Sequence, residues 1–187
     1  MLPITSHAVS ADARDVLRIA DDYLARVIAG EEYLVFDGAM GTMLQAAGLE
    51  AGELPELLCL NSPDEVTAIH RQYVEAGSLA VTTNTFGANA RKLGDAASVR
   101  EIFAAAVACV RNAGARYVVA DIGPTGALLA PLGTMSFDEA YGLFAEQVRA
   151  AAEAGADIIL IETMADLLEM KAAVLAAKEC SDLPVFA

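Results

Sequence analysis

Short apolar runs alternate along the chain with longer segments in which apolar residues recur every three to four positions. The longer segments, at 62–76, 96–113, 136–154 and 165–179, have the period of amphipathic helices, and a shorter helix is expected at 43–47. The short runs, at 33–36, 79–83, 117–120, 158–161 and 184–187, have the length of buried strands. The pattern therefore predicts strands and helices in alternation.

Three glycines mark a repeat along the chain. Gly77, Gly114 and Gly155 each stand between a helical segment and the next apolar run, with spacings of 37 and 41 residues. A helix C-terminus favours a residue with left-handed backbone angles at this position. Ser62 and Ser136 precede two of the helices, and each has a glutamate three residues later, which predicts a capping box. The repeat is therefore a helix, a glycine turn and a strand.

Repeated strand and helix units of this size are typical of an α/β fold with a parallel sheet. We favour a (β/α)8 TIM-barrel type over an open doubly wound sheet, because near-identical units suit cyclic closure whereas an open sheet reverses its strand order. Residues 33–187 then form the N-terminal half of a barrel domain, its first four to five βα units. Residues 1–32 form an N-terminal helical extension that covers the N-terminal end of the barrel. A partner-binding helix is the alternative.

The composition excludes several classes of protein. A hydrophobic fraction of 56% is incompatible with intrinsic disorder, and no apolar stretch has the length of a membrane span. A net charge of −14 repels nucleic acid and anionic membrane surfaces. No secretory leader is recognisable, so we expect a cytoplasmic location. Cys59, Cys109 and Cys180 form no CxxC pair and are expected to be free, reduced thiols.

Polar residues follow the predicted strands at the end where barrel active sites lie. They are Asp37, Asn84, Asp121 and Glu162, and Thr85 adds a small polar group beside Asn84. Three carboxylates and an amide at one mouth favour a ligand site. For Asp121 a structural role is an equal alternative to a ligand-binding role, because its side chain could cap the long loop that begins at Ile122.

The segment 37–42, which reads DGAMGT, has the composition of a ligand-binding turn. Gly38 and Gly41 permit unusual backbone angles and close approach of amide hydrogens, and Thr42 is placed to cap the following helix. A carboxylate beside amides that favour an anion suits a ligand with both charges, as an α-amino acid has. The alternative is a tight βα turn with a helix cap and no ligand.

No basic side chain is predicted beside Glu162. The lysines lie in or beside helices, and no arginine follows a neighbouring strand, so a cationic ligand group is a better partner for Glu162 than an internal arginine. The absence of a strand-end lysine also argues against a Schiff-base aldolase. His70 belongs to the helix after Ser62 and is interpreted as a partly buried helical histidine rather than a base.

Taken together, these segments resemble the homocysteine S-methyltransferase family, and within it the homocysteine-binding domain of cobalamin-dependent methionine synthases. The matching segments read FDGAMGT (36–42), PELL (55–58), TNTFGAN (83–89), IGP (122–124) and IILIET (158–163). The resemblance implies that Asp37 and Glu162 bind the amino group of homocysteine or a similar thiol amino acid. It also implies that the turn made of Gly38, Ala39, Met40, Gly41 and Thr42 receives the carboxylate.

The resemblance further implies a zinc ion that three cysteines hold and that lowers the pKa of the homocysteine thiol. In the family those cysteines lie on later strands, so they are expected beyond Ala187, and no metal site is expected in this chain. The methyl donor stays open between methylcobalamin, methylfolate and another activated methyl compound, supplied through other domains.

Three functions compete at this point. The first is a homocysteine S-methyltransferase whose chemistry this chain alone lacks. The second is a non-catalytic amino-acid-binding or assembly module made of the same half barrel. The third, weaker one takes Asp37, Asp121 and Glu162 as Mg²⁺ ligands of a lyase. A half barrel exposes a strand edge and an apolar inner face, so we also expect self-association or a complementing half barrel.

Overall fold

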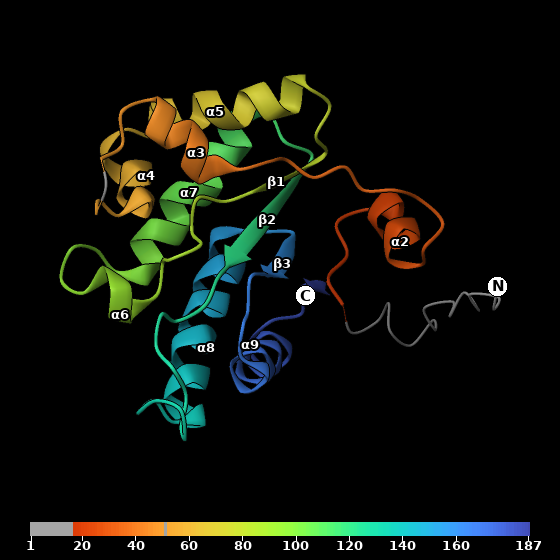
Figure 1. The fold of residues 1–187 in the computed structure, drawn as a ribbon. Coiled ribbons are helices and arrows are strands. Elements are labelled where there is room, and N and C mark those ends of the chain that lie inside the picture. The colour runs from red at the N-terminus through yellow and green to blue at the C-terminus, as the bar shows by residue number, and fades with distance from the viewer. Residues whose placement is uncertain (1–16, 51) are drawn as a thin grey trace, which may run out of the picture.

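The computed structural model describes residues 17–50 and 52–187, and its strands form one parallel sheet in the order β1-β2-β3-β4 (Figure 1). The strands are β1 (Ala80–Thr82), β2 (Tyr117–Ile122), β3 (Ile158–Ile161) and β4 (Val185–Phe186). The longer helices are α5 (Pro63–Glu75), α7 (Val99–Ala113), α8 (Phe137–Ala154) and α9 (Leu167–Cys180). The shorter helices are α2 (Asp22–Ile28), α3 (Met40–Ala46), η1 (Pro55–Leu57), α4 (Leu58–Asn61) and α6 (Ala90–Leu93).

The strand order follows the chain without a reversal, as the predicted barrel type requires and an open doubly wound sheet does not. Alternate residues of each strand face opposite sides. On the outer side, Ile122, Ile159 and Ile161 pack in one cluster with Phe103 of α7 and Phe144 of α8. Consecutive units therefore bury the outer face under helices. No helix in the described part of the chain is both long and apolar enough to cross a membrane.

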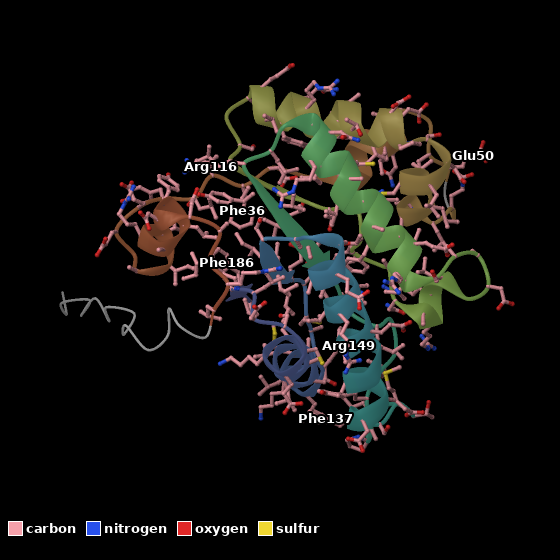
Figure 2. All side chains as sticks on the ribbon, turned by 180° about the vertical axis from the view of Figure 1, so that it is seen from behind. Phe36, Glu50, Arg116, Phe137, Arg149 and Phe186 are labelled. Atoms are coloured by element: carbon pink, nitrogen blue, oxygen red, sulfur yellow. The ribbon has the colours of Figure 1, made fainter. Side chains whose placement is uncertain are left out.

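The inner side of the sheet has its own apolar cluster. Tyr117 and Ile158 pack there with Leu24 of α2. The partly buried rings of Phe36 and Phe186 meet across this side at a centroid distance of 6.2 Å (Figure 2). The first and last segments of the described sheet thus approach each other, as they do in a closing barrel.

Helix α2 is held against the start of β2 and the inner cluster. Its cap Asp21 accepts hydrogen bonds from the amide of Leu24 (2.9 Å), the hydroxyl of Tyr117 (2.7 Å) and Arg116 (2.8 Å). Burial would raise the pKa of Asp21, but these bonds together lower it to about 2. Of the helical extension predicted over 1–32, residues 1–16 lie outside the described residues, and within 17–32 only Asp22–Ile28 is helical.

Two strand predictions need correction. The segment 33–36 is not a strand, because a single bridge joins Phe36 to Ala80. Its outward side chains have little to pack on, with Tyr33 89% and Val35 52% exposed. The strand predicted at 117–120 extends two residues further, so Asp121 lies inside β2 rather than after it. The remaining strands fall where the apolar runs predicted them.

The glycines at the helix C-termini were predicted correctly, whereas of the two capping boxes predicted at helix N-termini only one is present. Gly77, Gly114 and Gly155 have φ values of +107°, +86° and +92°, the left-handed angles expected of them. The capping box at Ser136 is present, whereas Ser62 makes no side-chain cap although α5 begins beside it. A capping box at Ser98, which the sequence reading missed, begins α7.

Candidate functional site

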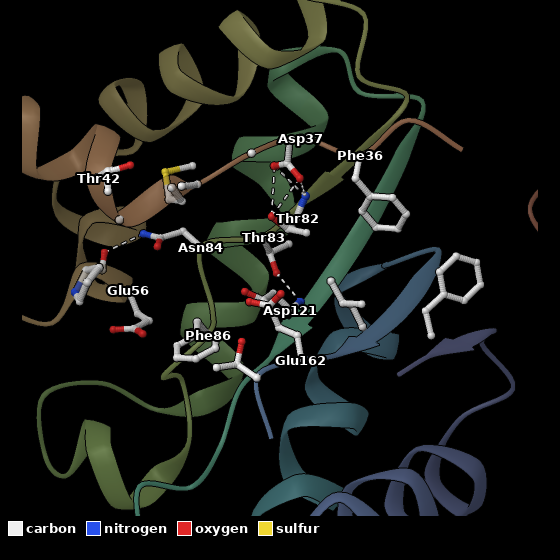
Figure 3. A pocket seen from close by; sticks show the side chains of 18 of the residues that line it. Phe36, Asp37, Thr42, Glu56, Thr82, Thr83, Asn84, Phe86, Asp121 and Glu162 are labelled. Carbon is white, nitrogen blue, oxygen red and sulfur yellow. Dashed lines mark hydrogen bonds between the residues drawn. The ribbon is translucent and has the colours of Figure 1, made fainter. Parts of the chain in front are cut away.

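Acidic side chains gather on the inner face at the carboxyl ends of the strands. Alternation along β2 puts Asp121 on the same side as Val119, and Glu162, just beyond β3, on the same side as Leu160. Asp37 follows the bridge at the edge of the sheet. These carboxylates line one pocket with a volume of about 790 Å³ (Figure 3). The predicted convergence of Asp37, Asp121 and Glu162 is therefore present.

Asp37 is half-buried and is held by Thr82 of β1. Both carboxylate oxygens lie 3.0–3.1 Å from the Thr82 amide and 3.1 Å from its hydroxyl. Burial raises the pKa of Asp37 to about 6; the bonds from Thr82 oppose the rise, and the charge of Glu162 adds to it. Thr82 therefore fixes the direction of a carboxylate that still has free lone pairs for a ligand.

Asp121 is almost completely buried, with 8% of its surface exposed. Its backbone is fixed from β1 and the following loop, because its amide donates to the Thr83 hydroxyl (3.1 Å) and its carbonyl accepts from the Thr85 hydroxyl (2.7 Å). Oδ1 of Asp121 has no hydrogen-bond partner. Burial, followed by the charges of the neighbouring carboxylates, raises the pKa of Asp121 to about 8.

The turn at 38–42 differs from its prediction in two respects. Helix α3 begins at Met40 with Ala39 as its cap residue, so Thr42 lies inside the first turn and is not the cap. Neither Gly38 nor Gly41 has a positive φ. Gly38 instead lets the ring of Tyr73 lie close to the backbone, because a Cβ there would lie 3.0 Å from that ring. Within residues 17–50 and 52–187, the amides of Gly38 and Ala39 donate to no acceptor.

The two polar residues predicted after β1 take different places. Asn84 lines the pocket, and its side-chain amide donates to the Pro55 carbonyl at 2.7 Å. Thr85 is fully buried and is not part of the lining, and its hydroxyl donates a hydrogen bond to the Asp121 carbonyl. Thr85 therefore positions Asp121 and does not face a ligand. The lining includes the remaining predicted residues, Gly38, Ala39, Met40, Gly41 and Thr42.

Glu56 and Thr163 line the pocket but were missed as site residues. Glu56 enters from η1, is 4% exposed, and accepts a 2.6 Å bond from the Gly87 amide with Oε1, while Oε2 has no partner. Thr163 has φ +60°, a strained angle for a β-branched residue, directly after Glu162. The PELL segment was a usable signal for Glu56, but Glu56 follows no strand. The IILIET segment likewise contains Thr163, but nothing in it indicated the backbone angle.

The pocket is acidic. Four carboxylates line it, those of Asp37, Glu56, Asp121 and Glu162, and within residues 17–50 and 52–187 the lining includes no lysine or arginine. The ammonium of Lys92 on α6 reaches the rim, where it donates to the Pro124 carbonyl (2.8 Å) and lies 5.6 Å from the ring centroid of Phe86. None of the four carboxylates forms a salt bridge with another described residue. A cationic ligand group would supply the missing charge.

Comparison with known proteins decides the family. A family model described as homocysteine S-methyltransferase matches residues 34–187. The chain belongs to the homocysteine S-methyltransferase family. The resemblance drawn from the segments at 36–42, 55–58, 83–89, 122–124 and 158–163 is thereby confirmed.

Relatives within the homocysteine S-methyltransferase family include two curated methionine synthases. That of Mycobacterium tuberculosis (strain H37Rv) is 37% identical over 182 residues, which cover 86% of this chain and 15% of the relative. That of Mycobacterium leprae is 35% identical over 178 residues, covering 83% and 15%. The chain thus spans about 15% of the length of the curated relatives it matches.

Solved structures support the same family fold. The homocysteine methyltransferase MmuM from Escherichia coli, in its oxidised form, matches with a TM-score of 0.76 at 19% identity, over 89% of this chain and 65% of that one. Its metallated form matches with a TM-score of 0.72 at 21% identity, over 86% and 64%. At these identities the likeness shows the fold, which is a TIM-barrel type with only part of its units present.

The metal that the family implies does not fit the residues described. No three His, Cys, Asp or Glu side chains in residues 17–50 and 52–187 converge in a way that could hold a metal ion. Cys59 and Cys109 are buried beside each other, whereas Cys180 lies on α9 near the hydroxyl of Tyr141. Among the described residues there is thus no cluster of three such side chains, either of cysteines for zinc or of carboxylates for the Mg²⁺ of the lyase alternative.

Proposed function

We propose that this pocket binds homocysteine or a similar thiol amino acid, as half of a barrel whose reaction is methyl transfer to the homocysteine thiolate. In this proposal Asp37, Asp121 and Glu162 hold the ammonium group. The turn from Gly38 to Thr42 receives the carboxylate, and Asn84 lines the path between them. The observation that carries the proposal is the cluster of pocket carboxylates without an internal cation.

Two parts of the pocket lining support opposite ligand charges. Asp121 has a buried oxygen without a donor among the described residues, which is costly unless a ligand donates to it. The amides of Gly38 and Ala39 lack acceptors among the described residues and stand before the first turn of α3. An α-amino acid offers three N–H donors and two carboxylate oxygens. It would therefore satisfy both groups at once.

We also propose that the 187-residue chain binds the amino acid without methylating it. Methyl transfer needs a thiolate and a methyl donor, and the described residues offer no metal site to stabilise the thiolate. The donor, methylcobalamin or methylfolate, would come through other domains. The binding module is thus the second candidate function, and it describes the chain by itself.

Titration calorimetry with homocysteine tests the binding proposal. Glu162→Gln and Asp37→Asn are each expected to weaken binding about tenfold to hundredfold, because each removes a charged partner of the ammonium. Among analogues, 4-mercaptobutanoate lacks the ammonium and 3-aminopropanethiol lacks the carboxylate, and both are expected to bind weakly. The same mixtures, with zinc and a methyl donor added, are expected to form no methionine.

Glu65→Gln is the matched control, because Glu65 is exposed on α5 away from the pocket. It is expected to leave affinity unchanged. Equal affinity for homocysteine and 4-mercaptobutanoate would contradict the ammonium site. Methionine formation by the wild-type chain would contradict the binding-only role.

We further propose that the chain self-associates through its inner face. Phe36, Leu160 and Phe186 are only partly buried there, and Val35 at the sheet edge is 52% exposed. A second copy or a complementing half barrel would cover these apolar groups. Light scattering at micromolar concentration is expected to give a mass above 19.5 kDa, and a monodisperse monomer would contradict the proposal.

A further inference from the structure

Asp121 and Glu162 occupy neighbouring positions on the inner face. Asp121 pairs in register with Leu160, and Glu162 lies two residues beyond Leu160, so alternation returns its side chain to the same side. The Glu162 amide donates to the carbonyl of Ile122 at 3.1 Å, which keeps the two chain segments together. Figure 3 shows both carboxyl groups directed into the pocket. Two acidic groups therefore share one side of the site.

Asp121 cannot withdraw from this position. The hydroxyl of Thr83 accepts a hydrogen bond from its amide, and the hydroxyl of Thr85 donates one to its carbonyl. Only 8% of the residue is exposed. Its Oδ1 is buried and receives no hydrogen bond from a described residue. In Asp37, by contrast, both carboxylate oxygens accept hydrogen bonds from Thr82. An ionised Asp121 would thus be a buried charge without a partner.

The charges around Asp121 add to this cost. Asp37 faces it from the bridging segment, Glu56 from η1 and Glu162 from the end of β3. Among the residues that the structure describes, no cation lines the pocket, and the ammonium of Lys92 on α6 donates to the Pro124 carbonyl. Helices α7, α8 and α9 pack on the outer side of the sheet. Carboxyl groups that crowd a buried site without a cation retain a proton, in agreement with the raised pKa of about 8 for Asp121.

We propose that Asp121 holds a proton in the free pocket and that the ammonium group of the bound amino acid displaces it. The inference rests on the proposed amino-acid site and adds to it the rule by which that site selects its ligand. The step is an exchange. The carboxylic acid O–H bond breaks and the proton leaves to solvent, and the resulting carboxylate accepts a hydrogen bond from an N–H group of the ammonium. No electrons are transferred.

This exchange makes Asp121 a specificity-determining residue. A ligand with a permanent positive charge at the amino position compensates the lost proton, whereas a neutral hydroxyl at the same position leaves the acid protonated and gains no ion pair. The pocket therefore selects 2-amino acids over the matching 2-hydroxy acids. Binding strengthens as pH rises from about 6 to 8, because less free energy is then needed to remove the proton.

Carboxyl ¹³C NMR of the ligand-free chain tests the proton directly. One carboxyl group is expected to titrate near pH 8, above Asp37, whose pKa is about 6. This titration is expected to be missing in Asp121→Asn and to move to lower pH in Glu162→Gln, which removes the neighbouring charge from an exposed position. Glu65→Gln is expected to leave it unchanged. The proposal is overturned if no carboxyl group titrates above pH 7, or if a titration above pH 7 survives in Asp121→Asn.

Calorimetry at pH 7 in buffers of different ionisation enthalpy tests the displacement. The wild-type chain is expected to release close to one proton on binding homocysteine and Asp121→Asn none, and the 2-hydroxy analogue is expected to bind at least tenfold more weakly than homocysteine. Homocysteine binding without proton release overturns the displacement. A chain that shows the neutral carboxyl titration yet binds no homocysteine contradicts the proposed substrate and, with it, the exchange.

Discussion

Gly123→Ala is expected to lower the free energy of unfolding by about 3 kcal/mol. Gly123 lies just beyond β2, and its amide donates to the Phe86 carbonyl at 3.1 Å. A Cβ added there would lie 2.7 Å from that carbonyl oxygen and 2.5 Å from the Phe86 ring. The ring can rotate away, but the backbone oxygen cannot without breaking the bond, so the loops after β1 and β2 must separate. Denaturant unfolding measures the change.

Gly142→Ala is the matched control for Gly123→Ala. Gly142 lies within α8, and a Cβ there would meet no atom within 4 Å. The control is expected to raise the free energy of unfolding by about 0.5–1 kcal/mol, because alanine favours the helix more than glycine does. A Gly123→Ala chain as stable as the wild type would show that the two loops are not held as close as described.

His70→Leu is expected to raise the free energy of unfolding by about 1–3 kcal/mol at pH 7. His70 lies in α5, which packs against α7 and β1, and its side chain is completely buried. Neither ring nitrogen has a hydrogen-bond partner. Leucine has a similar size and leaves no polar group without a partner, so the cost of burying the two nitrogens disappears.

The same substitution is expected to change the pH dependence of stability. Burial lowers the pKa of His70 from 6.5 to about 4. The unfolded chain therefore takes up a proton as pH falls below 6.5, while the folded chain takes it up only near 4, and the wild type loses about 3 kcal/mol between these values. His70→Leu lacks this loss, and urea unfolding at pH 7 and pH 5 measures about 2 kcal/mol of it, because pH 5 lies between the two pKa values.

His70→Gln separates the two effects of His70. Glutamine keeps buried polar atoms but has no titrating group. This variant is therefore expected to have the same free energy of unfolding as the wild type at pH 7, without the loss of stability as pH falls. If His70→Leu and the wild type had the same pH profile, the imidazole would have to be hydrogen-bonded or exposed.

The sequence predicted much of the fold because the relevant signals are local. The apolar runs at 79–83 and 158–161 predicted strands that the structure has, and Gly77, Gly114 and Gly155 end helices with the left-handed angles expected of them. These features depend on a few adjacent residues and their backbone preferences. The segment 33–36 has a similar apolar pattern, but it makes only a bridge because few partners cover it.

The site was predictable to the extent that it follows from strand periodicity. A parallel sheet brings its carboxyl ends to one edge, so residues placed after strands were expected to meet, and Asp37, Asp121 and Glu162 do line one pocket. The caps were less predictable. Ser62 and Ser98 have the same motif, yet only Ser98 forms the box, because Ser62 follows α4 with a backbone (φ −140°, ψ 54°) that does not aim its side chain at the helix.

By itself, the sequence determined the repeated units, the order of the strands and the acidic character of the mouth, all of which follow from local pattern and composition. Only the tertiary structure decided which polar groups face a ligand. It turned Thr85 inward to hold Asp121, brought Glu56 into the pocket from η1, and left Asp121 without a hydrogen bond to Oδ1. The first two outcomes depend on partners 36 and 31 residues away in the chain, and such contacts are set by packing rather than by neighbouring residues.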